Sequence, residues 1–336
     1  MNSITGNYLA SPIAISGWIP EGEENPIDLT TSIGNFNFTT VFRDLDPLLR
    51  GSKFLPTGTG SLLLTLNGSK KLPEIAGTLD LADTTAGNAF VNAAHVDVSY
   101  SAGVVDLINV TAEAYEGSIE ATGRINLLPA NPTWQIDCTF ANIDLAQYLD
   151  SNGYYAYEVN GPFSGTASGK GDFISQDSLQ MDAEVKSSSG KYLSPFSSRF
   201  MNIAAGTSNP GKADESELTD YDDIQINLRV RESRINVDRL HFVSNDLQLE
   251  ARGWIGFDHT LSGSGGFTIP LDKAKLHPKL RTVVALLPSS VNRVSLEFSI
   301  GGTLENVKIN PKIGENFLKG VLDRAGDALN IPGNLF

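Results

Sequence analysis

Residues able to carry out catalysis or bind metal ions are few in this sequence and do not gather into a pattern. No histidine stands in a His-Glu-x-x-His pattern, or at a metal-ligand spacing from a cysteine or an acidic residue. We therefore predict that all four are surface or turn residues: His95, His241, His259 and His277.

The single cysteine also has a structural interpretation. Cys138 alternates with Trp134, Ile136 and Phe140, which are apolar, so we predict a small buried side chain and not a nucleophile. One cysteine cannot form an internal disulfide, so the sequence leaves the redox compartment open.

Two glycine-rich segments invite comparison with phosphate-binding loops. Residues 58–60 and 263–266 lack the Lys-Ser/Thr pair or the following helix that such a loop needs. We interpret both as turns between strands.

An acidic run at residues 214–223 has carboxylates that a hard cation prefers, but it lacks the spacing and the glycine of a calcium loop. We expect a solvated loop, part of a polar insertion at residues 202–223. The acidic residues are Asp214, Glu215, Glu217, Asp220, Asp222 and Asp223.

These observations predict a protein that is not an enzyme and uses no metal or cofactor. The 336 residues carry a formal net charge of −14, which argues against a nucleic-acid partner. With 40% hydrophobic residues the chain has enough apolar surface to fold. The sequence contains no run of about 20 apolar residues, so it does not predict a membrane-spanning helix.

The dominant pattern along the chain is alternation of apolar and polar residues, which is typical of β-strands that bury one face. Clear examples are residues 118–122, 134–140, 224–230 and 247–251. Clusters of Gly, Asn, Asp and Ser separate the runs and predict antiparallel hairpins, as at residues 67–69 and 152–153. Short helices are expected near residues 41–49 and 273–287.

The alternating segments also repeat. Residues 105–123 align without a gap with residues 235–253, and residues 14–19 match the end of the same motif. We predict repeats at 1–122, 123–252 and 253–311, the last one shorter. An amphipathic helix and tail at 312–336 would cap the array, with an apolar stripe that includes Phe317, Leu318, Val321 and Leu322.

A sheet with one apolar face and no long helix to cover it must close on itself, pack on a second sheet or bind an apolar ligand. We predict an all-β fold with minor helix, in which an elongated, curved, mostly antiparallel repeat sheet forms an open apolar groove. The alternative is a β-sandwich or β-solenoid, in which the same aliphatic residues form a sealed core. The residues predicted to line the groove are Leu62, Leu64, Leu66, Leu79, Leu81, Val96, Val98, Val105, Leu107, Ile119, Ala121, Ile136, Ile224, Ile226, Leu228, Ile235, Val237, Leu247, Leu249, Leu296, Phe298 and Ile300.

Several sequence segments resemble those of a known family. Gly17, Gly123 and Gly253 each stand two residues before an isoleucine. Residues 114–123 and 298–311 each combine a strand pattern with turn residues. Together with the amphipathic segment that follows, they resemble the C-terminal region of AsmA-like and TamB-related proteins.

This resemblance implies a periplasmic, membrane-associated β-groove that passes phospholipid or another acyl lipid between the inner and outer membranes of a diderm bacterium and supports outer-membrane integrity. It implies partners at both membrane surfaces, and an inner-membrane anchor that we expect outside this chain. The competing hypothesis is a non-enzymatic surface or adhesin-like structural protein with a sealed core.

Overall fold

The computed structural model describes residues 2–8, 11–21, 25–37, 57–86, 89–151, 159–193, 218–270, 293–304 and 306–312. Within them the chain forms 19 strands in one open antiparallel sheet, one α-helix and one short 3-10 helix. The chain divides into two compact units. Unit 1 comprises residues 1–156 and 162–182, and unit 2 comprises residues 157–161 and 183–336.

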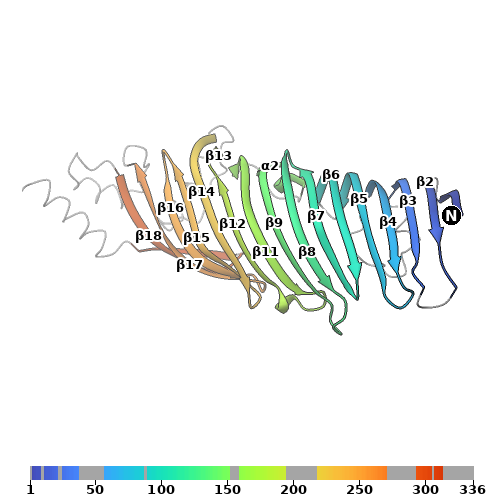
Figure 1. The fold of residues 1–336 in the computed structure, drawn as a ribbon. Helices are drawn as coiled ribbons and strands as arrows, with labels where there is room; N and C mark the ends of the chain where they lie inside the picture. The colour runs from blue at the N-terminus through green and yellow to red at the C-terminus, as the bar shows by residue number, and fades with distance from the viewer. Residues whose placement is uncertain are drawn as a thin grey trace, which may run out of the picture. The chain divides into compact units, whose positions relative to one another are not determined.

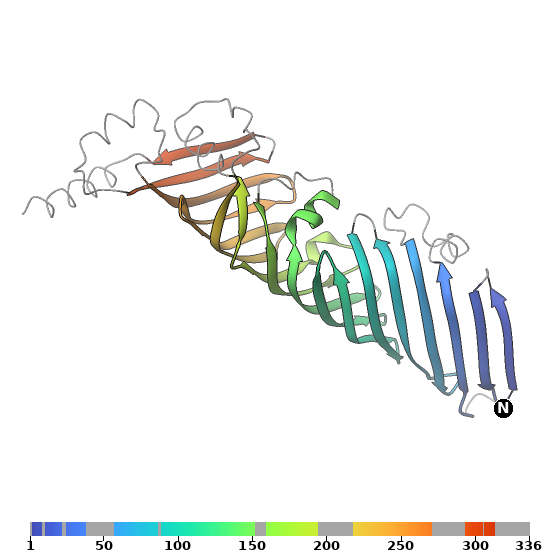
Figure 2. The ribbon, with the colours of Figure 1, turned by 90° about the horizontal axis from the view of Figure 1, so that it is seen from above.

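Unit 1 is an up-and-down sheet in which each strand pairs with the next one along the chain. Strand β9 pairs with β11 after a short helix, α2 (Leu145–Ser151). Figures 1 and 2 show the blue-to-green strands side by side in this order. The strands are β1 (Asn2–Tyr8), β2 (Ser11–Trp18), β3 (Asp28–Asn37), β4 (Thr57–Gly68), β5 (Pro73–Ala86), β6 (Ala89–Ser101), β7 (Val104–Ala114), β8 (Gly117–Asn126), β9 (Thr133–Asp144) and β11 (Pro162–Asp172).

Unit 2 has the same up-and-down order from β14 to β19, with β13 and then β10 paired outside β14. Strand β12 (Gln180–Ser187) follows the 3-10 helix η1 (Gln176–Ser178) and also pairs with β14. The other strands are β10 (Val159–Asn160), β13 (Gly190–Leu193), β14 (Leu218–Arg231), β15 (Arg234–Ser244), β16 (Gln248–Gly256), β17 (Thr260–Pro270), β18 (Arg293–Thr303) and β19 (Asn306–Lys312).

Tight turns keep neighbouring strands antiparallel. The β6–β7 turn has Ala102 and Gly103 at φ 48° and 82°, and the β14–β15 turn has Glu232 and Ser233 at 52° and 56°. Two successive residues with positive φ match the right-handed twist of a two-residue hairpin. At Gly68, where β4 ends, φ is 85°, in keeping with the turn predicted at residues 67–69.

The all-β, antiparallel part of the sequence prediction is confirmed. Within the described part of the chain, all strands belong to one open sheet, so neither a sandwich of two sheets nor a solenoid is seen there. The division into compact units describes packing and does not test the predicted repeats, whose boundaries stay a prediction.

Three local predictions were wrong. Residues 263–266 lie inside β17 and residues 58–60 inside β4, so these glycines are not turns between strands. The end of the expected acidic loop, including Asp220, Asp222 and Asp223, belongs to β14, where alternation tolerates carboxylates on a solvated face. Residues 41–49, 152–153, 202–217 and 273–287 lie outside the described residues.

Helix α2 was missed because it is only seven residues long, so the helical spacing of Leu145, Tyr148 and Leu149 covers a single turn. Its local signal is Asp144, whose Oδ1 accepts a hydrogen bond from the Gln147 amide at 2.9 Å. This is the N-cap arrangement that satisfies a free amide at a helix start.

Candidate functional site

The strand registers of unit 1 place its apolar side chains on one side of the sheet in four rows that cross the strands. Partners in register point to the same face, so each row is a line of side chains perpendicular to the strands. Row 1 contains Leu29, Leu66, Ile75, Tyr100, Val105, Ile125, Trp134 and Gly171. Row 2 contains Ile15, Thr31, Leu64, Gly77, Val98, Leu107, Gly123, Ile136 and Gly169.

The other two rows complete this surface, which we call the apolar face of unit 1. Row 3 contains Ile13, Ile33, Leu62, Leu79, Val96, Val110, Ala121, Cys138 and Ala167. Row 4 contains Gly60, Leu81, Ala94, Ala112, Ile119, Phe140 and Gly165. All twelve groove residues predicted between Leu62 and Ile136 lie in these rows.

The side chains of this face remain partly in water. Apart from Gly60 and Gly165, every residue of the four rows is half-buried or exposed, and Ile136 is 37% exposed. The buried apolar residues of unit 1 (Ile27, Phe36, Ala114, Tyr115 and Phe163) lie outside the rows. No second sheet covers the apolar face within the part of the chain that the structure describes.

Glycines let larger neighbours lie flat on the sheet. A Cβ atom at Gly169 or Gly171 would stand 3.3 or 3.4 Å from the indole ring of Trp134, which lies over the bare backbone of β11. A Cβ at Gly77 would stand 2.5 Å from the Leu64 side chain. The glycines therefore make the apolar face flatter, because neighbouring side chains can lie close to the backbone where a glycine has no side chain.

Unit 2 has the same row pattern, but a set of its side chains is buried, and we call this set the sealed core of unit 2. One row runs through Ile224, Phe242, Leu249, Phe267 and the backbone of Leu296, and the next includes Ile226 and Phe298. The buried residues are Tyr192, Tyr221, Ile224, Val230, Phe242, Leu247, Leu249, Phe267 and Phe298, each at most 8% exposed. Of the other predicted groove residues, Ile226, Leu228, Ile235, Val237 and Ile300 are half-buried.

An aromatic cluster not found by sequence reasoning occupies one end of this interior. The rings of Tyr192 and Phe242 meet edge to face with centroids 4.9 Å apart, and Tyr221 lies 5.9 Å from Phe242. The Tyr192 hydroxyl shares a hydrogen bond with Ser244 at 2.9 Å, and the Tyr221 hydroxyl shares one with Ser187 at 2.8 Å. Both buried hydroxyls are thus satisfied, as an ordinary protein core requires.

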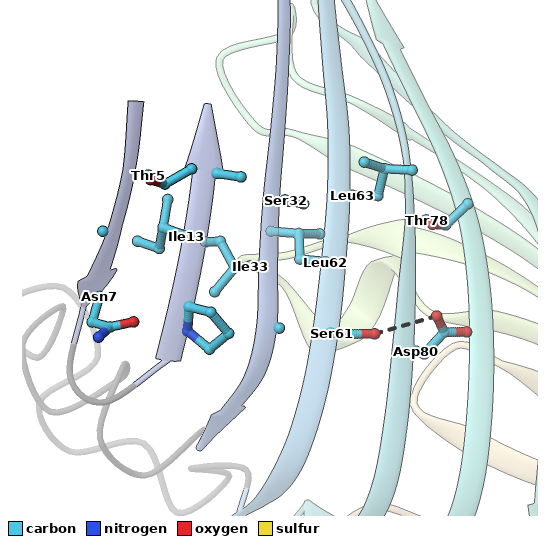
Figure 3. A pocket seen from close by; sticks show the side chains of 14 residues that line it. Thr5, Asn7, Ile13, Ser32, Ile33, Ser61, Leu62, Leu63, Thr78 and Asp80 are labelled. Atoms are coloured by element: carbon cyan, nitrogen blue, oxygen red, sulfur yellow. Dashed lines mark hydrogen bonds between the residues drawn. The ribbon is translucent and has the colours of Figure 1, made fainter. Parts of the chain in front are cut away.

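An open depression with a volume of about 760 Å³ lies over β1 to β5. Figure 3 shows apolar Ile13, Ile33 and Leu62 beside polar Ser61 and Asp80, whose side chains share a hydrogen bond at 3.4 Å. Ser61 and Leu62 are consecutive in β4, so the lining comes from both phases of the alternation. The depression therefore lacks the convergent polar groups of a small-molecule active site.

The opposite face of unit 1 is polar, and it contains His95. The imidazole of His95 lies between Asp80 on β5, at 2.6 Å from Nδ1, and Asp97 on its own strand, at 3.1 Å from Nε2. Both ring nitrogens donate only when the imidazole is protonated. The hydrogen bond to Asp80, followed by the charge of Asp97, raises the pKa of His95 above its ordinary value of 6.5, although partial burial opposes the shift.

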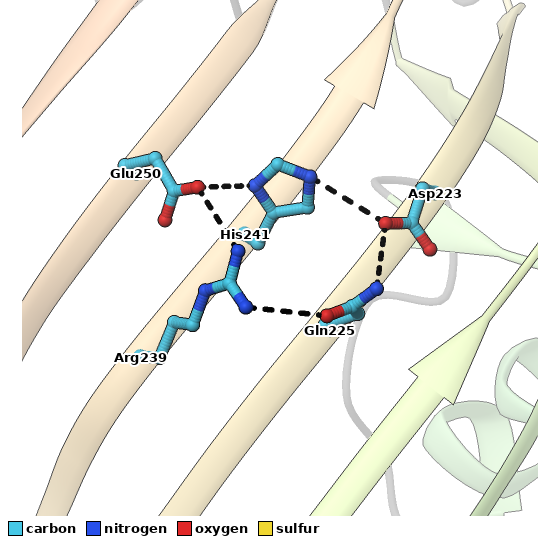
Figure 4. Close-up of polar contacts among 5 residues, drawn as sticks. All are labelled: Asp223, Gln225, Arg239, His241 and Glu250. Atoms are coloured by element: carbon cyan, nitrogen blue, oxygen red, sulfur yellow. Dashed lines mark hydrogen bonds and ion pairs between the residues drawn. The ribbon is translucent and has the colours of Figure 1, made fainter.

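A second histidine network lies on the polar face of unit 2 (Figure 4). His241 on β15 contacts Glu250 on β16 through Nδ1, and its Nε2 is 3.5 Å from Asp223 on β14. Arg239 donates to Gln225 and to Glu250, each at 3.4 Å. Burial raises the pKa of Glu250, but hydrogen bonds from Arg239 and His241 outweigh it and leave the pKa below its ordinary value.

These networks correct the prediction that the histidines are isolated. His95 and His241 lie within strands, and their carboxylate partners come mainly from neighbouring strands, which sequence spacing cannot reveal without the register. His259 follows β16 in a turn at φ 66°, as predicted, and His277 lies outside the described residues.

The polar networks do not have the composition of a metal site. Among the described residues, no group of three or more His, Cys, Asp or Glu is placed to hold a metal ion. Cys138 lies in row 3 of unit 1 and is half-buried, whereas we predicted a buried side chain. Burial, followed by the nearby charge of Asp137, raises the pKa of its thiol, and a backbone hydrogen bond from Ala167 does not offset this.

Within the described ranges, no helix has the length and apolar character needed to cross a bilayer. The predicted capping helix with Phe317, Leu318, Val321 and Leu322 falls outside those ranges. Comparisons with protein-family models, curated proteins and solved structures give no match.

We expect His95 to titrate above pH 6.5 in NMR spectra, and Asp80→Asn to lower its pKa. Asp106→Asn, which removes the 2.6 Å partner of Arg124 elsewhere on the polar face, is the matched control and should leave that pKa unchanged.

Because the folded-state pKa is raised, the stabilisation by His95 is complete below the unfolded pKa and is lost as pH rises through the folded value. The excess stability of wild type over His95→Gln should therefore shrink above pH 6.5; a growing excess would contradict the assignment.

Proposed function

We propose that the chain binds lipid, with acyl chains lying on the apolar face of unit 1. The observation that carries this proposal is that four in-register apolar rows remain half-exposed across the strands from β2 to β11. Removal of apolar surface from water contributes about 25 cal/mol per Å², so hydrocarbon laid on this face stabilises both ligand and protein.

The dimensions of the face suit hydrocarbon chains. Neighbouring strands stand about 4.8 Å apart, so each row extends about 29 Å along its length over the seven strands from β3 to β9. A bilayer core about 30 Å thick holds two layers of acyl chains, so one chain extends about 15 Å. The face therefore has room for more than one chain, and a row without breaks lets a chain slide from strand to strand.

The composition of the rows favours a ligand without polar groups along its length. Leu, Ile, Val, Ala and Gly predominate, and aromatic side chains occur at only a few positions, such as Tyr100, Trp134 and Phe140. Polar side chains are nearly confined to the other face, which suits solvent. A phospholipid would leave its head group in water beyond the end of the rows.

The sealed core of unit 2 is the observation that favours the alternative, a purely structural or adhesive protein. Phe298 is 1% exposed and Phe267 2%, so this interior needs no foreign molecule to complete it. We therefore confine the binding proposal to unit 1 and interpret the aromatic interior of unit 2 as structural support.

Transport belongs to the same proposal, as the resemblance to AsmA-like proteins implies. The open sheet would form a groove that carries phospholipid through the periplasm between inner and outer membranes and supports outer-membrane integrity. The absence of a catalytic constellation in the described residues is compatible with this role.

Cys138 provides a test because it is the only cysteine and lies on the apolar face beside Ala121 and Ala167. We expect short-chain phosphatidylcholine, added as monomers, to slow the reaction of Cys138 with a water-soluble thiol reagent several-fold. The control is Thr139→Cys in a Cys138→Ala background, since Thr139 is exposed on the polar face. Equal rates with and without lipid at both positions would contradict acyl binding on this face.

A charged substitution in each unit should distinguish the open apolar face from the sealed core by the loss in free energy of unfolding. Leu79→Asp, at a half-buried site in row 3, should abolish lipid protection of Cys138 while lowering the free energy of unfolding by about 1–2 kcal/mol. Leu249→Asp, at a side chain only 7% exposed, should cost about 4 kcal/mol or more. Denaturant unfolding measures both, and equal large losses would indicate that unit 1 is sealed too.

A further inference from the structure

The hairpin turns at one end of the strands of unit 1 hold large apolar side chains in solvent. These side chains are between 48% and 70% exposed, although each belongs to a turn or strand end that the structure describes. We call this set the turn edge: Trp18, Ile19, Leu72, Leu127, Leu128, Phe173 and Ile174.

The topology brings these turns to the same end. In an up-and-down sheet every second turn lies at the same end, and the turns after β2, β4, β8 and β11 belong to this series. Row 1 of the apolar face is the row nearest to them, since its members Leu66 and Ile125 precede the turns by one to two residues. The turn edge therefore borders the apolar face.

Backbone hydrogen bonds fix neighbouring turns to one another. The Leu127 amide donates to the Gly103 carbonyl of the β6–β7 turn at 2.8 Å, and the Phe173 amide donates to Pro132 of the β8–β9 turn at 3.2 Å. The Ile27 amide donates to Gly68 at 2.6 Å, linking the β2–β3 and β4–β5 turns. These hydrogen bonds link neighbouring turns at the described residues that they join.

Other hydrogen bonds satisfy the backbone amides of exposed apolar residues at the turn edge. Leu72 donates its amide to the Ser69 carbonyl at 3.1 Å, Leu128 to the Asn126 side chain at 3.1 Å, and Ile174 to Asp172 at 2.8 Å. An unpaired amide is costly to remove from water, whereas a paired one is not. These residues can enter hydrocarbon without leaving their own amides unsatisfied.

The β7–β8 turn, which is described at the other end of the strands, gives a contrast. In the β7–β8 turn, Tyr115 is 8% exposed and its hydroxyl accepts a hydrogen bond from the Phe90 amide at 2.9 Å, while the exposed position is the charged Glu116. Scattered exposed apolar residues need no explanation, but their accumulation at one end of a sheet does.

We propose that the turn edge of unit 1 docks on the surface of a phospholipid bilayer, with its apolar side chains inserted among the lipid head groups and upper acyl segments. The turns after β2 and β4 lie two strand spacings apart, about 10 Å, as do those after β8 and β11, whereas the turns after β4 and β8 lie four spacings apart, about 19 Å. The same turns also contain polar residues such as Ser69 and Asn131. Fluid lipid fills the gaps between separate tips, whereas a protein partner needs a continuous complementary surface.

Charge does not drive this docking. Lys70 and Lys71 beside Leu72 are opposed along the edge by Glu21, Asp28, Glu74, Asp172 and Asp177, and the whole chain has a net charge of −14. Insertion therefore depends on apolar burial, which salt does not screen. The edge should bind zwitterionic lipid and retain that binding at high ionic strength.

Docking at the edge is independent of acyl binding on the apolar face, although the two surfaces are adjacent. If both occur, a bilayer held at the turn edge lies next to row 1, and an acyl chain reaches the face sideways without crossing open water.

The test is flotation of the full chain with phosphatidylcholine vesicles at low and high salt. The triple variant Leu128→Asp, Phe173→Asp and Ile174→Asp changes only exposed side chains, so it should fold, with circular dichroism as the check. The matched controls are Ile108→Asp and Leu63→Asp, which are 58% and 44% exposed on strands away from the turns. We expect the triple variant to lose at least about tenfold in vesicle partitioning, and the controls to bind like wild type.

Other results would overturn the proposal. Wild-type chain that does not float, or a triple variant that floats as well as wild type, excludes docking by this edge. Flotation lost in Leu79→Asp but kept in the triple variant would assign membrane contact to the apolar face. If the triple variant instead dissociates an oligomer without affecting flotation, the edge is a contact between copies. Protection of Cys138 by monomeric lipid in the triple variant reports acyl binding separately.

Discussion

A single antiparallel sheet has two faces, and the face with apolar side chains must be covered before folding can remove that surface from water. In unit 2, side chains such as Phe242 and Phe298 achieve this and are almost fully buried. In unit 1 the equivalent rows stay half-exposed across nine strands, β2 to β9 and β11. The lipid proposal depends on this difference, because the surface left in contact with water is the surface that a hydrocarbon ligand would cover.

Polar interactions keep such a sheet in register while its apolar face stays open. Cross-strand groups on the polar face, including His95 with Asp80 and Arg124 with Asp106 at 2.6 Å, join neighbouring strands without reaching the apolar rows. Each exposed pair contributes little free energy, but the register it favours determines which residues face which side. A slip by one residue would move the polar side chains onto the apolar face and break the rows.

The sequence was sufficient for the class of fold and for the alternation along strands such as β4, β6 and β8. Alternation placed Leu62, Val96 and Ile119 on a common face, because the side-chain period of a strand is two wherever the strand lies. It could not show how exposed these residues are, since exposure depends on what packs over the sheet. It also placed glycines such as Gly265 in turns, although a Cβ there would stand 2.7 Å from the Phe298 ring inside a strand pair. The carboxylate partners of His241 and the linked turns of the turn edge depend on pairing between distant segments, which alternation does not encode.

The most direct measurement is photo-crosslinking with a phospholipid that has a diazirine in its acyl chain, followed by mapping of the modified residues. The account predicts adducts on β4 to β9 at row positions such as Leu64, Leu79 and Val98, with none at the intervening polar positions such as Thr65 and Asp97. Adducts spread equally over both phases of these strands, or concentrated in the aromatic interior of unit 2, would contradict it.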